Sequence, residues 1–269
     1  LAPARIAGTQ LTLEEYQQLT EPVSLTLELP PTADGSGLSV SLMLGALLLA
    51  VFLGIGLLFT AITGEKTQRV TEGVISAISP RAWIDGKVYG TILNAIVNIA
   101  AIGVGVLLAI AIPVLVRTGS LPRLPALPGG DPLMLVVALL FAIAGGLLYF
   151  FLFAALAATV DDPTSSQRSG VIMLPALFIG VGWLGLIGDP GSLAFRILSY
   201  VPLTSPGALP VRMVLGDAGA LEAALSFALL ALGVHYARRA AGTVFSLGIL
   251  MTGKEPSWRE MAHWVRRVQ

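Results

Sequence analysis

Long uncharged apolar stretches alternate with short polar segments along most of this chain. The stretches are approximately 38–62, 88–116, 133–160, 171–187 and 221–236. A helix rises about 1.5 Å per residue, so stretches of this length cross or nearly cross a hydrocarbon layer of roughly 30 Å. We therefore predict an all-α integral membrane protein with about five transmembrane helices.

Composition agrees with a membrane location. The chain is 55% hydrophobic and 12% charged, with a mean hydropathy of +0.84, which is more apolar surface than one soluble core can bury. The formal net charge is zero, so no global basic field exists for binding nucleic acid. The absence of cysteine excludes disulfides, thiolate catalysis and cysteine zinc sites.

The basic residues predict an orientation, because cytoplasmic flanks hold an excess of Lys and Arg. Eleven of the sixteen basic residues fall in the loop after the first stretch, the loop after the third and the C-terminal tail. Residues 1–37 are instead mainly acidic. We expect an outside N-terminal segment and a cytoplasmic C-terminus.

This orientation also suggests a domain organisation. We expect residues 1–37 to be the remnant of an extracytoplasmic domain, 38–250 a transmembrane domain and 251–269 a cytoplasmic tail. The chain begins at Leu1 without a signal peptide. An outside N-terminus then implies a preceding transmembrane helix that this sequence lacks.

Two segments between the stretches have their own patterns. Residues 64–78 place apolar side chains on one helical stripe opposite charged ones, which predicts an amphipathic helix at the cytoplasmic surface. Ser79 and Pro80 then form an N-cap and first position for a second short helix leading into the next span. The segment 189–217 combines several prolines with apolar residues, which favours short re-entrant or interfacial helices.

Few residues in this sequence indicate a catalytic, nucleotide-binding or ion-coupling site. Thr91, Asn94 and Asn98 share one helical face, which predicts either helix packing or a polar pathway. Residues 248–254 match the start of a phosphate-binding loop, but Glu255 replaces the required hydroxyl residue, so we expect no ATPase site. The spans are expected to lack ionisable groups, whereas ion-coupled carriers keep one near the midplane. Energy for transport would therefore come from a partner.

Three segments resemble the permeases of type-2 ABC exporters, particularly the sodium or drug exporter branch. They are GEKTQRVTEGVISAISPRAWIDGKVYG, SYVPLTSPGALPVRM and GILMTGKEPSWREMAHWVRR, at residues 64–90, 199–213 and 248–267. The resemblance covers approximately Leu38 to the C-terminus. In that family five further helices follow a first helix and a large outside domain, so the five spans here would be helices two to six.

The resemblance also implies roles for particular residues. A cytoplasmic elbow that docks on the ATPase subunit would include Glu65, Arg69, Glu72, Pro80, Arg81 and Lys87. Re-entrant hairpins would include Tyr200, Pro202, Leu203, Pro206 and Pro210. The expected partners are an ABC ATPase, which would hold ATP and magnesium, and a second permease in a homodimer or heterodimer.

We therefore expect a non-enzymatic permease subunit of an ATP-driven exporter in a prokaryotic plasma membrane. The alternative is a membrane sensor or scaffold that does not transport and whose outside domain binds a ligand. An intramembrane hydrolase ranks third, because Asp161 and Asp162 are more simply explained by a turn before Pro163. No span carries a residue pattern that is diagnostic of one substrate class.

Overall fold

The computed structural model describes residues 5–6, 9–10, 36–67, 77–120, 132–160, 169–248 and 260. It divides into two units, Leu1–Pro30 and Pro31–Gln269. In the first unit, β1 (Arg5–Ile6) pairs antiparallel with β2 (Thr9–Gln10). All the long helices belong to the second unit, and the predicted all-α membrane fold is confirmed.

Four helices of the second unit are long and apolar enough to cross a membrane. They are α2 (Ser36–Thr67), α4 (Pro80–Thr118), α5 (Pro132–Ala157) and α9 (Ala220–Gly248). The fourth predicted span, 171–187, corresponds to α6 (Leu174–Ile187), which follows the 3-10 helix η2 (Ser169–Met173) and is shorter.

Two predicted boundaries differ from the observed ones. Residues 64–67, expected in a separate surface helix, continue α2, and α9 continues past Tyr236 to Gly248. The predicted start at Pro80 is observed: Ser79 is the N-cap, and its hydroxyl accepts a hydrogen bond from the Ala82 amide at 3.3 Å. No break separates a short helix from the span, because α4 is continuous for 39 residues.

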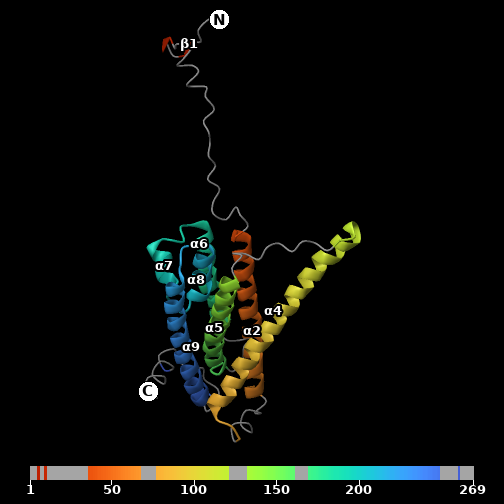
Figure 1. Cartoon of the computed structure of the whole chain (residues 1–269). Helices are drawn as coiled ribbons and strands as arrows, with labels where there is room; N and C mark the ends of the chain where they lie inside the picture. The colour runs from red at the N-terminus through yellow and green to blue at the C-terminus, as the bar shows by residue number, and fades with distance from the viewer. Residues whose placement is uncertain are drawn as a thin grey trace. The chain divides into compact units, whose positions relative to one another are not determined.

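The helix α5 lies at the centre of the bundle and packs against α2, α4, α8 and α9 (Figure 1). Its aromatic side chains Phe141, Tyr149, Phe150 and Phe151 are fully buried. The ring of Phe150 crosses α2 at Gly54, where a β-carbon would lie 2.2 Å from it. Bulky aromatics on one helix and a glycine on the next let these two helices approach closely.

The helix α4 leans away from α2 and α5 toward its C-terminal end (Figure 1). Residues 101–109 are all exposed. Between the diverging helices lies a cavity of about 430 Å³ lined only by apolar residues. The outer half of α4 is therefore an apolar rod with little packing against the rest of the chain.

The segment between α6 and α9 enters the bundle and turns back, as predicted for re-entrant helices. It contains α7 (Leu193–Leu198) and α8 (Ser205–Val214). At the turn, Pro202 contacts α9 at Gly233, which lies about 20 Å along the helix from Ala220. The turn therefore reaches about half the depth of the bundle.

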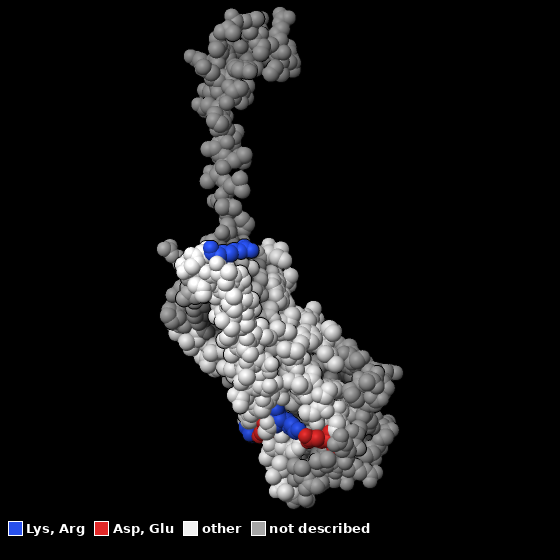
Figure 2. Space-filling view, turned by 90° about the vertical axis from the view of Figure 1, so that its right-hand side faces the viewer, with Lys and Arg blue, Asp and Glu red and all other residues white. Residues whose placement is uncertain are grey.

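Charged side chains are confined to limited parts of the surface. On the face drawn in Figure 2, a basic patch lies near the upper end of the described helices, basic and acidic residues lie together toward the lower end, and the described surface between them is uncharged. An uncharged band between charged ends is the surface that a bilayer can cover without burying ions.

Candidate functional site

The N-terminal end of α4 is joined to the C-terminal half of α9 by an ion pair. Arg238 donates to Asp85 twice, from Nε to Oδ1 at 2.8 Å and from the guanidinium NH2 to Oδ2 at 2.6 Å. The two residues are 153 positions apart in the sequence. A bidentate pair of this kind fixes the relative angle of the two helices as well as their distance.

An aromatic contact reinforces the same connection. The rings of Trp83 on α4 and Phe245 on α9 stack with centroids 4.5 Å apart and planes 9° apart. One turn away, a β-carbon at Gly242 would lie 2.7 Å from Cγ of Arg81, so the Arg81 side chain crosses α9 at this glycine. The first residues of α4 are thus in close contact with α9 over about two turns of that helix, from Arg238 to Phe245.

The same end of α4 is also tied to α2. Lys87 donates to a carboxylate oxygen of Glu65, and its ammonium lies 5.2 Å from the centroid of the Trp83 ring. Both charged side chains are partly exposed, so the ion pair contributes modestly to stability. We call the six residues that join these three helix ends the α4 junction: Glu65, Trp83, Asp85, Lys87, Arg238 and Phe245.

Two of the residues predicted for the cytoplasmic elbow, Glu65 and Lys87, are members of the α4 junction. The structure brings Glu65 and Lys87 together and places Pro80 at the first position of α4. Arg69 and Glu72 lie outside the described residues. The docking role assigned to these residues stays a prediction.

The predicted polar face of α4 makes hydrogen bonds within the helix. The buried Thr91 hydroxyl donates to the Lys87 carbonyl at 2.8 Å. Asn98 donates to the Asn94 carbonyl at 2.8 Å and to its side-chain oxygen at 3.1 Å, and both asparagines are exposed. A polar pathway at this face stays a prediction.

The predicted hairpin residues lie at the re-entrant turn and along α8. Pro206 meets α5 at Gly145, where a β-carbon would lie 2.5 Å from the proline ring. The Tyr149 hydroxyl donates to the Leu203 carbonyl. Two further members, Tyr200 before the turn and Pro210 inside α8, are half-buried and buried respectively. The turn is thus held by α5 on one side and, through Pro202, by α9 on the other.

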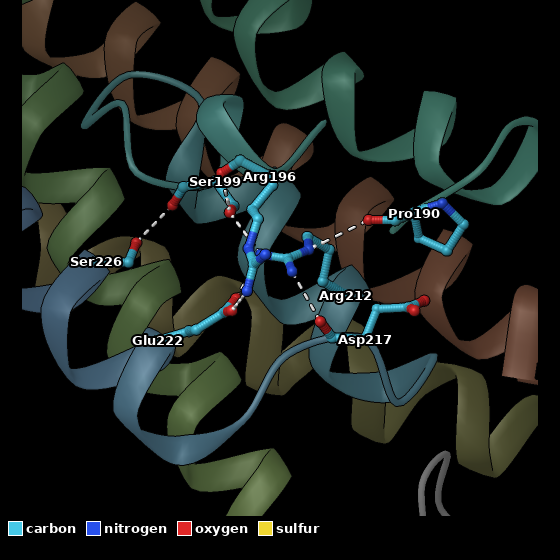
Figure 3. A network of polar contacts seen from close by, with 7 residues as sticks. All are labelled: Pro190, Arg196, Ser199, Arg212, Asp217, Glu222 and Ser226. Atoms are coloured by element: carbon cyan, nitrogen blue, oxygen red, sulfur yellow. Dashed lines mark hydrogen bonds and ion pairs between the residues drawn. The ribbon is translucent and has the colours of Figure 1, made fainter. Parts of the chain in front are cut away.

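A buried arginine anchors the other end of the hairpin (Figure 3). The Arg212 side chain, 2% exposed, pairs with Glu222 at 2.8 Å. It also donates to the Ser199 hydroxyl at 3.0 Å and to the carbonyls of Asp217 and Pro190 at 2.7 and 3.2 Å. A buried guanidinium needs such partners, since an unpaired charge in this environment is costly.

Two neighbouring contacts complete this network. Ser226 on α9 donates to the Ser199 carbonyl at 2.6 Å. The exposed Arg196 on α7 donates to the other oxygen of Glu222, and this hydrogen bond and charge raise the pKa of Arg196. One carboxylate therefore links α7, α8 and α9, and we call Arg196, Arg212 and Glu222 the Glu222 network.

The Glu222 network corrects one expectation from the sequence. The spans were expected to hold no ionisable residue, but Glu222 lies in the first turn of α9 and His235 lies near the middle of that helix. Arg212 falls in the segment 189–217 between the predicted spans, and the structure places its backbone in α8 with the side chain buried. An arginine flanked by Val211 and Met213 was the available signal of burial.

Comparisons with known proteins agree with the fold. A family model described as "ABC-2 family transporter protein" matches residues 4–234. An uncharacterized protein of Methanocaldococcus jannaschii is 23% identical over 201 residues, which are 73% of this chain and 46% of that protein. The chain therefore spans less than half the length of this curated relative. None of the solved structures matches the chain.

Proposed function

Because this chain belongs to the ABC-2 transporter family, we propose that it couples ATP hydrolysis by a separate ABC ATPase to the export of a substrate. Its part in the transporter is that of the membrane permease. ATP and magnesium bind to the partner subunit and not to this chain. The proposed direction of transport, out of the cell, rests on the resemblance of residues 64–90, 199–213 and 248–267 to the sodium or drug exporter branch.

The α4 junction is the observation that carries this proposal. The segment 68–76 joins α2 to α4, and the two helices are tied to each other and to α9 directly beyond it. An ATPase that displaces this segment would move α4, and the ion pairs would pass the displacement to α2 and α9. Ion pairs and one aromatic stack are weak enough individually to rearrange during a transport cycle.

The length and sparse packing of α4 support the step in which its movement at the junction reaches its far end. A helix of 39 residues is about 58 Å long, so a small rotation at one end becomes a larger movement at the other. The outer half has few neighbours in this chain, and an apolar cavity lies beside the middle of the helix, between Ile92 and Ala100. A tilt of α4 therefore meets little resistance from packing at its far end.

The proposed location is the plasma membrane of a prokaryote, with the α4 junction on the cytoplasmic side. Excess basic residues around this junction and in the tail support that orientation. A second permease, identical or different, would complete the transporter. The apolar outer half of α4 is a surface that such a partner or lipid can cover.

Co-purification tests the proposed partner. The full-length protein, solubilised from its own host with mild detergent, is expected to retain an ABC ATPase identified by mass spectrometry. Arg69→Ala combined with Glu72→Ala should weaken retention, whereas Arg117→Ala, at the far end of α4, should not. Retention of no ATPase, or equal loss in both variants, would contradict the proposed docking site.

Export is tested separately in inverted membrane vesicles. ATP is expected to drive accumulation of a host metabolite or lipid that vesicles without the permease do not accumulate. Single cysteines test the orientation, because the native chain has no cysteine. Labelling from the same side at positions 66 and 267, and from the other side at 117, is the expected pattern.

A further inference from the structure

A second cavity lies on the side of α9 that faces α5, below the re-entrant turn. Its volume is about 880 Å³. The walls come from α5, α9, the turn and the first residues of α4. On α5 it exposes Leu152, whose side chain is 40% exposed although the adjacent Phe151 and Phe153 are buried. The cavity is therefore open to the surroundings of the protein rather than enclosed in the core.

Two cationic groups line the cavity without a carboxylate partner among the residues that the structure describes. Four basic side chains in the described part of the chain bind a carboxylate: Lys87, Arg196, Arg212 and Arg238. Within that same part, the guanidiniums of Arg81, Arg117 and Arg239 have no carboxylate partner. Arg81 and Arg239 line this one cavity, whereas Arg117 lies at the opposite end of α4.

The polar and apolar walls are separated along the helix axis. Arg81, Arg239 and Thr243 lie toward the α4 junction, while Leu203 and Gly233 lie at the upper end beside the turn. From Gly233 to Arg239 the distance along α9 is about 9 Å, and to Gly242, which Arg81 crosses, about 14 Å. Half of a hydrocarbon layer measures roughly 15 Å. When the turn lies near the bilayer centre, Arg81 lies close to headgroup depth, and Arg239, about 5 Å deeper, can extend its long side chain toward the same level.

We propose that this cavity binds an anionic phospholipid from the leaflet that surrounds the α4 junction. The phosphate group lies between Arg81 and Arg239, and the adjoining parts of the acyl chains lie against Leu148, Leu152 and Leu203. Planar guanidiniums bind phosphate oxygens through paired hydrogen bonds, which gives the site its preference for an anion. The lipid would bridge α4 and α9 next to their existing ion pair.

The test measures which lipid the full-length protein retains. The protein is reconstituted in nanodiscs of equal parts phosphatidylglycerol and phosphatidylcholine, released into mild detergent and weighed by native mass spectrometry. The wild type is expected to retain phosphatidylglycerol preferentially. The double variant R81Q/R239Q should lower the ratio of retained phosphatidylglycerol to phosphatidylcholine by roughly 30-fold, as expected for two basic side chains near an anionic surface.

Three matched variants make the result specific. R81K/R239K keeps both charges and should retain most of the preference, and R117Q should retain all of it. Ala240→Trp fills the polar end of the cavity without changing charge and should reduce retention of both lipids. Equal retention by wild type and R81Q/R239Q, or an equal loss in R117Q, would overturn the proposal. The measurement requires neither an ATPase nor a substrate, so it is independent of the proposed export function.

Discussion

Replacing Glu222 by Gln tests whether the re-entrant hairpin is held by a buried charge. The variant keeps the size of the side chain and one acceptor oxygen but removes the negative charge that faces Arg212. The Arg212 side chain is 2% exposed and Glu222 is 18% exposed, so water cannot replace the lost charge efficiently. Removing one partner of a buried ion pair costs about 3–5 kcal/mol.

The lower end of that range applies here. Arg212 keeps three neutral acceptors, from Ser199, Asp217 and Pro190. We therefore expect a loss of about 3 kcal/mol, or a decrease of roughly 6–12 °C in melting temperature for a chain of this size. The assay is thermal unfolding of the full-length protein in nanodiscs, followed by tryptophan fluorescence.

Two variants control this experiment. Glu65→Gln removes the charge from a partly exposed pair with Lys87 and should cost at most about 1 kcal/mol. The double variant R212M/E222Q removes both charges of the buried pair and should melt above E222Q, since the only cation left without Glu222 is the exposed Arg196. A melting temperature for E222Q close to that of E65Q, or a double variant less stable than E222Q, would refute the buried-charge argument.

Two packing predictions concern the same hairpin. Tyr149→Phe removes the donor to the Leu203 carbonyl and should cost about 1–3 kcal/mol, seen in the same melting assay; an unchanged melting temperature would show that the carbonyl has another donor. Gly207→Ala places a β-carbon 2.6 Å from the backbone oxygen of Ile179 and should cost about 1–3 kcal/mol by forcing α6 and α8 apart. Gly56→Ala, with nothing within 4 Å, should be neutral or stabilising by up to about 1 kcal/mol, and equal effects of the two glycine variants would contradict this packing.

The membrane-spanning helices could be predicted from the sequence, because a sufficiently long apolar stretch is enough to identify such a helix. Four of the five stretches correspond to helices that could cross a membrane, and the remaining one, 171–187, corresponds to the shorter helix α6. The end of α9 was missed for a related reason. Arg238 and Arg239 end the apolar stretch, but basic residues are good helix formers, so the helix continues into Gly248.

The contacts of the candidate site depend on tertiary packing and were not visible locally. Asp85 and Arg238 are far apart in sequence, and neither stands out among its neighbours. The start of α4 could be predicted from the sequence, because Ser79 as N-cap and Pro80 as first residue act only on the backbone next to them. Sequence patterns therefore located the segment near the α4 junction, while its pairing required the arrangement of the whole bundle.

The most direct test of the coupling mechanism is a charge exchange across the α4 junction. Asp85→Arg and Arg238→Asp, each alone, place like charges together and should reduce the permease-dependent ATP hydrolysis of the complex in vesicles. The combined exchange restores an ion pair and should recover most of that activity at equal amounts of assembled protein. Full activity in both single variants, or no recovery in the combined one, would contradict transmission through α4 and α9.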